Sequence, residues 1–198
     1  VEGVDEADIV KNDGKYIYKA SYEGIVILDA FPAQEMKIVS RINLTNPQEI
    51  YVNGDKLVVF GNNAGNYYIM EKMSIAIWPP RNYNPTSYIK VYDISDRANT
   101  ILKRDMEANG TYFNSRMIGD HVYAIVNSPA YSDVVPLFSP NQKGFPDIYY
   151  FPFPDYSYQY TNIMALNVND DLQAPTNKVF LLGYSTNMYV SQNNIYLV

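Results

Sequence analysis

Short apolar runs alternate with turn-forming residues along the whole chain. Polar turns at residues 12–14, 53–55, 119–120 and, more weakly, 191–193 each precede a run rich in β-branched and aromatic residues. Turn residues between such runs are typical of β-hairpins. No stretch repeats its apolar residues with the 3.6-residue period of a helix. The pattern therefore predicts an all-β chain.

The apolar runs form repeat units, and the third run of each unit ends in a short polar residue. This residue lies at a nearly constant distance from the first residue of the hairpin run in the next unit. That distance is 27, 28 and 27 residues, for Asp29 to Lys56, Asp93 to His121 and Asn167 to Asn194. The distance within a unit varies instead, and its smallest value is the 14 residues from Lys15 to Asp29. The smallest complete unit thus falls within the roughly 40–45 residues of a four-stranded propeller blade.

The repeat predicts a fragment of a β-propeller, with three four-stranded antiparallel blades and the first half of a fourth. Residues 8–45, 46–110 and 111–185 form the predicted blades, and residues 186–198 open the next one. A β-sandwich with coincidental spacing is the alternative, and the three matching distances disfavour it. The predicted strands are 8–12, 15–20, 25–29, 36–44, 49–52, 56–61, 88–93, 100–106, 115–118, 121–127, 162–167 and 178–184.

Two long inserts, residues 62–87 and 128–161, lie between the second and third strands of blades 2 and 3. Loops at this position project from one face of a propeller, and such insertions often form the binding face. Both inserts are rich in aromatic residues and proline, and tyrosine is well suited to recognition. A lid in which the inserts pack on each other remains the alternative. The candidate ligand-binding residues are Tyr67, Tyr68, Trp78, Tyr83, Tyr149, Tyr150 and Phe151.

Composition narrows the classes of partner. The formal net charge is −6 and Lys and Arg do not cluster, so we expect no nucleic-acid ligand. No cysteine is present, which excludes disulfides and thiol chemistry. No apolar run approaches the roughly 18 residues that a transmembrane segment needs.

Candidate metal ligands gather at the start of the chain. Glu2, Asp5, Glu6 and Asp8 place four carboxylates within seven residues, and Ca²⁺ prefers clustered oxygen ligands. Their spacing matches no EF-hand loop, and a solvated approach to the first strand is the simpler interpretation. His121 is the only histidine and follows a hairpin turn, so we predict neither a catalytic triad nor a histidine-based metal site.

The first 18 residues, VEGVDEADIVKNDGKYIY, closely resemble the start of a family of secreted archaeal and bacterial proteins. These proteins carry a C-terminal β-propeller domain distantly related to WD-40 repeats. Residues 28–32 and 91–96 are similar to that family's strand-and-turn segments. The resemblance implies export or a cell-surface location and a ring larger than this chain. It brings no established activity and no site residues.

These observations together favour a non-catalytic extracellular or cell-surface binding module. We expect its partner to be a protein or polysaccharide of the cell envelope. A propeller lyase or hydrolase with its active site mostly on further blades is an alternative, because fold does not determine function. A structural spacer in the envelope is another alternative.

The sequence ends at Val198, inside an apolar run, so we expect self-association or pairing with remaining blades. Asn43-Leu44-Thr45 and Asn109-Gly110-Thr111 fit the N-glycosylation acceptor, which matters only for an exported protein.

Overall fold

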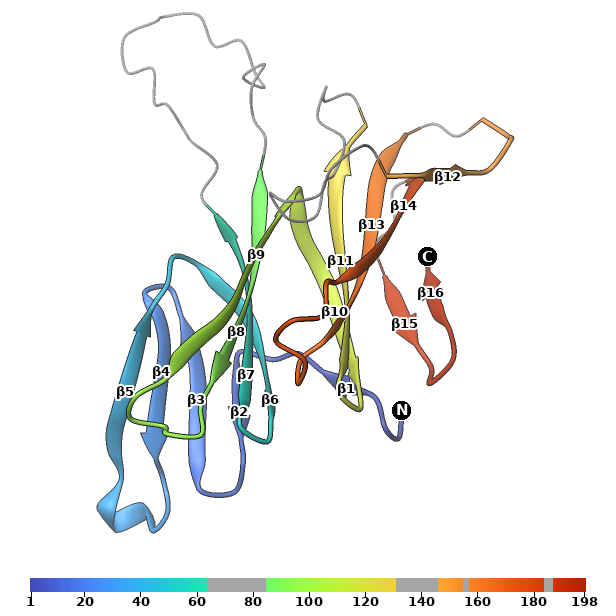
Figure 1. Cartoon of the computed structure of the whole chain (residues 1–198). Coiled ribbons are helices and arrows are strands. Elements are labelled where there is room, and N and C mark those ends of the chain that lie inside the picture. The colour runs from blue at the N-terminus through green and yellow to red at the C-terminus, as the bar shows by residue number, and fades with distance from the viewer. Residues whose placement is uncertain (64–84, 131–145, 155–156, 184–186) are drawn as a thin grey trace, which may run out of the picture.

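The computed structural model describes residues 1–63, 85–130, 146–154, 157–183 and 187–198. Within these ranges the chain is all β, with one short 3-10 helix, η1 (Ala33–Glu35). The strands form successive sheets that stand side by side (Figure 1). The predicted all-β propeller fragment is confirmed.

Blades 1 and 2 are four-stranded antiparallel sheets in which each strand pairs with the next along the chain. Blade 1 contains β2 (Val10–Asn12), β3 (Tyr16–Ser21), β4 (Gly24–Asp29) and β5 (Lys37–Asn43). Blade 2 contains β6 (Pro47–Asn53), β7 (Lys56–Asn63), β8 (Thr86–Asp93) and β9 (Ile101–Asn109). The β6–β7 turn is tight because Gly54 adopts a φ of 57°, which side chains disfavour.

Blade 3 is larger than the predicted four strands. Its consecutive antiparallel strands are β10 (Thr111–Ile118), β11 (His121–Pro129), β13 (Gln159–Asn167) and β14 (Thr176–Leu182). The N-terminal strand β1 (Asp5–Glu6) pairs antiparallel with β10, and β12 (Ile148–Tyr150) pairs parallel with β14. The sheet is therefore six-stranded, in the order β1-β10-β11-β13-β14-β12. A final hairpin contains β15 (Met188–Val190) and β16 (Ile195–Leu197).

The second insert is shorter than predicted because β11 and β13 continue their pairing further along the chain. Their ladder extends to the pair Pro129–Gln159, inside the predicted insert 128–161. Part of the insert then returns to the sheet as β12, along the outer side of β14. The strand β12 lies beside β14 in Figure 1. The described part of this insert thus extends blade 3 at its outer edge.

The polar residues that end the third strands, Asp29, Asp93 and Asn167, occupy matching register positions, and we call them the landmarks. Asp93 pairs with Lys56 and Asn167 pairs with His121, and these partners are the first residues of β7 and β11. Asp29 pairs with Tyr16, the first residue of β3. In blade 1 the second strand therefore begins one residue later than the sequence pattern predicts, at Tyr16 instead of Lys15.

Backbone hydrogen bonds confirm this equivalence. The amides that follow the three landmarks donate to the residue before each second strand: Ala30 to Lys15, Ile94 to Asp55, and Val168 to Asp120. The three N···O distances are 3.0, 2.8 and 2.9 Å.

Two of the three landmarks cap turns in the manner of Asx turns. Asp93 Oδ1 accepts from the Ser95 amide at 3.0 Å, and Asn167 Oδ1 accepts from the Asn169 amide at 3.0 Å. Asp29 departs from this pattern, since its Oδ1 is buried with no hydrogen-bond partner among the described residues and its Oδ2 lies 3.7 Å from Lys15 Nζ.

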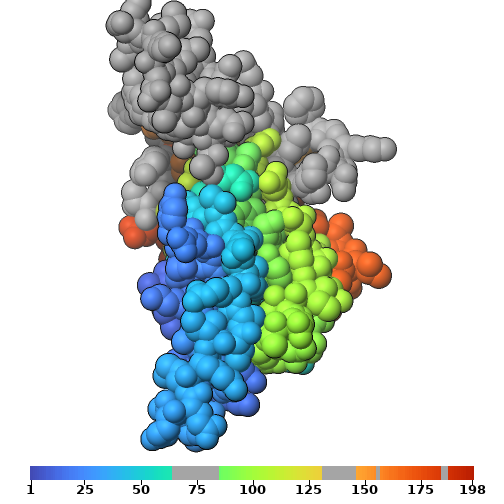
Figure 2. Space-filling model, turned by 90° about the vertical axis from the view of Figure 1, so that its left-hand side faces the viewer, coloured from blue at the N-terminus to red at the C-terminus, as the bar shows by residue number. Residues whose placement is uncertain are grey.

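The hydrophobic core consists of two clusters, one on each side of blade 2. Leu57 and Val59 of β7 pack toward blade 1, while Val58 and Phe60 pack toward blade 3. Successive strand residues point to opposite faces, so an uninterrupted apolar run is needed where both faces are covered. The run Leu57–Phe60 supplies it, and blade 2 is the central layer in Figure 1. Figure 2 shows the blue surface of blade 1 beside the green surface of blade 2.

Loops between third and fourth strands connect each blade to the preceding one. Ser40 of β5 donates to the carbonyl of Arg97 in the β8–β9 loop at 2.8 Å. Arg104 of β9 donates to the carbonyls of Asp170 and Gln173 in the β13–β14 loop, at 3.0 and 2.7 Å. The same contact thus recurs between blades 1 and 2 and between blades 2 and 3.

The N-terminal segment crosses the first strands of several blades instead of staying with blade 1. Asp8 and Ile50 of β6 exchange two backbone hydrogen bonds, and β1 continues along β10. Further toward the N-terminus, Gln192 Nε2 in the last hairpin donates to the Glu2 carbonyl at 3.1 Å. Residues 1–9 therefore link blades 1, 2 and 3 with the β15–β16 hairpin.

Candidate functional site

A group of aromatic side chains is exposed at the outer edge of blade 3. We call Tyr149, Tyr150, Phe151 and Phe153 the aromatic edge. The exposed fractions are 69% for Tyr150, 62% for Phe151 and 63% for Phe153, and Tyr149 is also exposed. Adjacent exposed apolar side chains on a folded protein mark surfaces that bind partners.

Strand pairing and proline determine the shape of the aromatic edge. Tyr149 pairs with Phe180 of β14, and the two ring centroids are 5.5 Å apart. Lys178 Nζ lies 5.4 Å from the Tyr149 ring centroid, a cation–π contact. After β12, Phe151 and Phe153 flank Pro152, and their rings stack with centroids 5.4 Å apart and planes 16° apart. The rings therefore form a defined surface.

Three of the seven predicted ligand-binding residues meet at this edge: Tyr149, Tyr150 and Phe151. Phe153 belongs with them although it was not among the predicted site residues. The alternation of aromatic residues and proline from Phe151 to Pro154 was the available signal. The other four predicted residues, Tyr67, Tyr68, Trp78 and Tyr83, lie outside the described residues.

Three of the four candidate metal-binding carboxylates have partners within the protein. Asp5 Oδ1 accepts from Lys11 Nζ at 2.7 Å, and Glu6 Oε1 lies 3.2 Å from Arg116 Nη2. Asp8 Oδ1 accepts from the Ile9 amide. Glu2 is exposed, and its backbone carbonyl is the group that contacts the last hairpin.

Within the ranges that the structure describes, no group of three or more His, Asp or Glu side chains could hold a metal ion.

A buried chain of hydroxyl groups joins blades 2 and 3, and the sequence pattern gave no indication of it. Ser115 Oγ lies 3.0 Å from Tyr51 Oη and 2.7 Å from Tyr112 Oη. Tyr112 Oη donates to Glu49 Oε2 at 2.5 Å. Burial raises the pKa of both tyrosines well above the usual value, and the Glu49 carboxylate adds to the shift at Tyr112.

This hydroxyl chain can hold two first strands together, but its composition does not indicate a nucleophile. The one histidine of the sequence, His121, instead opens β11 at an exposed hairpin turn, and Glu49 contacts Tyr112 and not Ser115. The hydroxyls of Tyr51 and Tyr112 remain protonated near neutral pH, since the pKa of each is raised.

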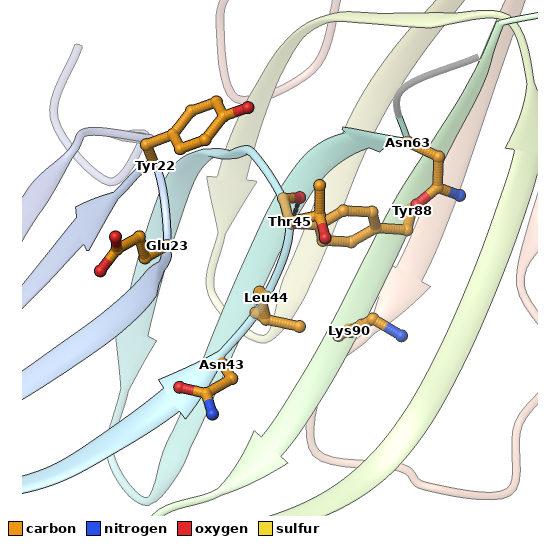
Figure 3. Close-up of a pocket in the computed structure, with 8 residues that line it drawn as sticks. All are labelled: Tyr22, Glu23, Asn43, Leu44, Thr45, Asn63, Tyr88 and Lys90. Carbon is orange, nitrogen blue, oxygen red and sulfur yellow. Dashed lines mark hydrogen bonds between the residues drawn. The ribbon is translucent and has the colours of Figure 1, made fainter. Parts of the chain in front are cut away.

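A groove of about 500 Å³ separates the edges of blades 1 and 2. Tyr22, Asn43 and Leu44 line it from blade 1, and Tyr88 and Lys90 line it from β8 (Figure 3). Tyr88 Oη crosses the boundary and donates to the Thr45 carbonyl at 2.9 Å. In Figure 3 the Leu44 side chain points toward Lys90, while the Asn43 amide points away from Tyr88.

The family model described as "Beta propeller domain" matches residues 1–198. The chain belongs to the β-propeller domain family. An uncharacterized protein of Methanocaldococcus jannaschii is 26% identical to this propeller over 200 aligned residues. The alignment covers 99% of this chain but 28% of that relative, so the chain spans less than a third of the relative's length. No solved structure matches the propeller. Among the described residues, no helix is long and apolar enough to cross a membrane.

Proposed function

We propose that this propeller is an extracellular or cell-surface interaction module that binds a partner protein through the aromatic edge of blade 3. Membership of the β-propeller family supports a binding or interaction role in general. The aromatic edge is the observation that carries the finer proposal, because it exposes four rings on one short strand and the turn after it.

The chemistry of these rings favours a protein partner. Phe151 and Phe153 have no polar side-chain atoms, so their stacked faces gain most from covering by apolar side chains. Tyr150 adds a large ring with a hydroxyl at low conformational cost, which is characteristic of interface anchors. A partner that presents aliphatic or aromatic side chains matches this surface.

The backbone of β12 offers a second means of attachment. One edge of β12 pairs with β14, and none of the described strands pairs with the other edge. An unpaired edge accepts an extended segment of another chain, whose backbone hydrogen bonds add to side-chain contacts. The partner is therefore proposed to bind as an extended apolar segment along β12.

Binding by a Phe151→Ser, Phe153→Ser double variant tests this proposal. The purified propeller is immobilised and exposed to cell-envelope proteins of the source organism, and retained proteins are identified by mass spectrometry. A specific partner should bind the wild type saturably and lose at least about tenfold in affinity with the double variant. Leu172→Ser is the matched control, because Leu172 is 96% exposed but lies in the β13–β14 loop, away from β12.

The same experiment separates the other possibilities. An envelope polysaccharide that binds the wild type but not the double variant would replace the protein partner with a carbohydrate. Light scattering that shows the wild type dimerising and the double variant monomeric would make a second copy the occupant. Equal binding by the wild type and the double variant would exclude the aromatic edge from the function.

A further inference from the structure

We propose that Asn43, at the edge of blade 1, is a site of N-linked glycosylation, and that the sugar is attached after the blade has folded. This inference rests on the extracellular location in the proposed function. The sequence contains two Asn-x-Thr acceptors with x other than proline, at Asn43 and Asn109. A third such spacing, Asn84-Pro85-Thr86, has the excluded proline.

The two acceptors occupy equivalent positions in the repeat. Asn43 is the last residue of β5 and Asn109 is the last residue of β9, and each of these is the fourth strand of its blade. The amides that follow them make the same contact, Leu44 to the Glu23 carbonyl at 3.3 Å and Gly110 to the Pro85 carbonyl at 2.7 Å. The repeat thus places each acceptor where the chain leaves one blade for the next.

Accessibility distinguishes the two positions. The side chains of Asn43 and Thr45 are both exposed, whereas Asn109 is half-buried and Gly110 is buried. A Cβ added at Gly110 would lie 2.6 Å from the Asn127 carbonyl of blade 3, so this turn is enclosed by the next blade. A transferase that acts on the folded propeller can therefore reach Asn43 more easily than Asn109.

The Asn43 side chain is available for the reaction. In the part of the chain that the structure describes, its amide makes no side-chain hydrogen bond, and it points away from Tyr88 and Lys90 in Figure 3. Asn43 borders the groove between blades 1 and 2, and because its exposed amide points away from the far wall (Figure 3), an attached sugar would extend into solvent. An attached glycan would therefore break no side-chain hydrogen bond of Asn43 among the described residues.

The chemistry requires one external reactant, a lipid-linked oligosaccharide phosphate or pyrophosphate. The Asn43 amide nitrogen forms a bond to the anomeric carbon of the sugar, and the bond from that carbon to the phosphate oxygen breaks. The amide loses one proton, and the lipid phosphate or pyrophosphate leaves with the bonding electrons. No oxidation or reduction takes place. The Thr45 hydroxyl is the part of the acceptor that the transferase recognises.

Mass spectrometry of the protein isolated from its source organism tests the proposal. Trypsin should release residues 42–56, which contain Asn43, and residues 105–116, which contain Asn109. We expect the first peptide to carry a glycan on Asn43 in most molecules and the second to carry less or none. A glycan on Asn109 with an unmodified Asn43 would overturn the proposal.

Two substitutions at one position provide the matched control. Thr45→Val removes the hydroxyl but keeps the branched shape, and Thr45→Ser keeps the hydroxyl. Tyr88 bonds to the backbone carbonyl of Thr45, so neither change removes that contact. When each variant is produced in the source organism, Asn43 should be unmodified in Thr45→Val and modified in Thr45→Ser. A modification that persists in Thr45→Val would exclude the proposed acceptor.

Protease treatment of intact cells separates this proposal from the proposed function. Propeller that is digested from outside and has an unmodified Asn43 overturns the glycosylation proposal and leaves the interaction role intact. Propeller that is protected inside the cell overturns both proposals.

Discussion

The guanidinium Nε of Arg97 donates to the hydroxyl of Tyr18 at 3.1 Å, although 79 residues separate them in the chain. Arg97 also bonds to Asp55 Oδ1 at 2.6 Å and to Asp13 Oδ2 at 3.2 Å, and it lies over the Tyr16 ring. One side chain from blade 2 thus binds the first hairpin of blade 1 and the first hairpin of its own blade. Burial opposes the charge of Arg97, but these bonds outweigh it and raise its pKa.

Replacing Arg97 should weaken the packing of blade 1 on blade 2. We expect Arg97→Ala to lower the free energy of unfolding by about 1.5–3 kcal/mol, the range for hydrogen bonds to a charged group. Urea denaturation followed by tyrosine fluorescence measures this change. Arg41→Ala is the control, since Arg41 is exposed on β5, and it should change stability by less than about 0.5 kcal/mol. Equal losses for both variants would contradict the role of Arg97.

Asp13 should make the propeller sensitive to acid. Burial raises the pKa of Asp13, but hydrogen bonds from the Tyr16 amide, the Tyr18 hydroxyl, the Lys15 amide and Arg97 outweigh it and hold the pKa below 3.8. Because the folded pKa is lower than the unfolded value, Asp13 stabilises the fold above about pH 4. That stabilisation is lost as the pH falls from about 4 through the folded pKa.

The acid transition of an Asp13→Asn variant tests this assignment. The variant should be less stable than the wild type at pH 7, and the difference should shrink as the pH falls below about 4. Urea denaturation at several pH values between 7 and 2.5 gives both curves. A difference that is constant across this range would show that the charge of Asp13 does not contribute.

The buried hydroxyl chain between blades 2 and 3 should be sensitive to the loss of one oxygen. Tyr112→Phe keeps the stacked contact with Phe60, whose ring centroid is 4.8 Å away, but removes the partner of Glu49 and Ser115. We expect a loss of about 1–3 kcal/mol, because a buried polar group is left without its hydrogen bond. Thermal unfolding measures it, with Tyr22→Phe as the exposed control. Equal melting temperatures for the two variants would contradict this prediction.

Lys56 and Asp171 should stabilise the boundary between blades 2 and 3 as a pair. Lys56 Nζ donates to both carboxylate oxygens of Asp171, at 2.9 and 3.1 Å, and both side chains are partly exposed. A double-mutant cycle with Lys56→Met and Asp171→Asn should give a coupling free energy of about 0.5–1 kcal/mol, reduced in 1 M salt. Additive effects of the two substitutions would show that the pair contributes nothing.

Local pattern was sufficient to predict the strands of blades 1 and 2. The run Leu57–Phe60 must be apolar because both faces of blade 2 are covered, and the landmarks at Asp93 and Asn167 mark matching strand ends. The register of blade 1 was missed by one residue. Asp13 Oδ1 accepts from the amides of Lys15 and Tyr16, so the turn includes Lys15 and the strand begins at Tyr16.

Strands whose partners are distant in the sequence could not be predicted. The strand β1 has two residues, and nothing in their pattern specifies a partner in β10. The strand β12 has three residues inside a proline-rich insert, and it pairs in parallel with β14. Periodicity reports which face of a strand is buried but does not identify its neighbour. The same limit applies to Arg97, whose partners lie on two other hairpins.

The position of β1 has a consequence for the order in which the propeller assembles during synthesis. Asp5 is synthesised 112 residues before its partner Met117. Blades 1 and 2 can form from local contacts while the first residues remain unpaired, since their strands pair with neighbours along the chain. The contact of β1 with β10 then becomes possible only after blade 3 has emerged. The strand β1 is therefore added to its sheet late, long after its own two residues have been synthesised.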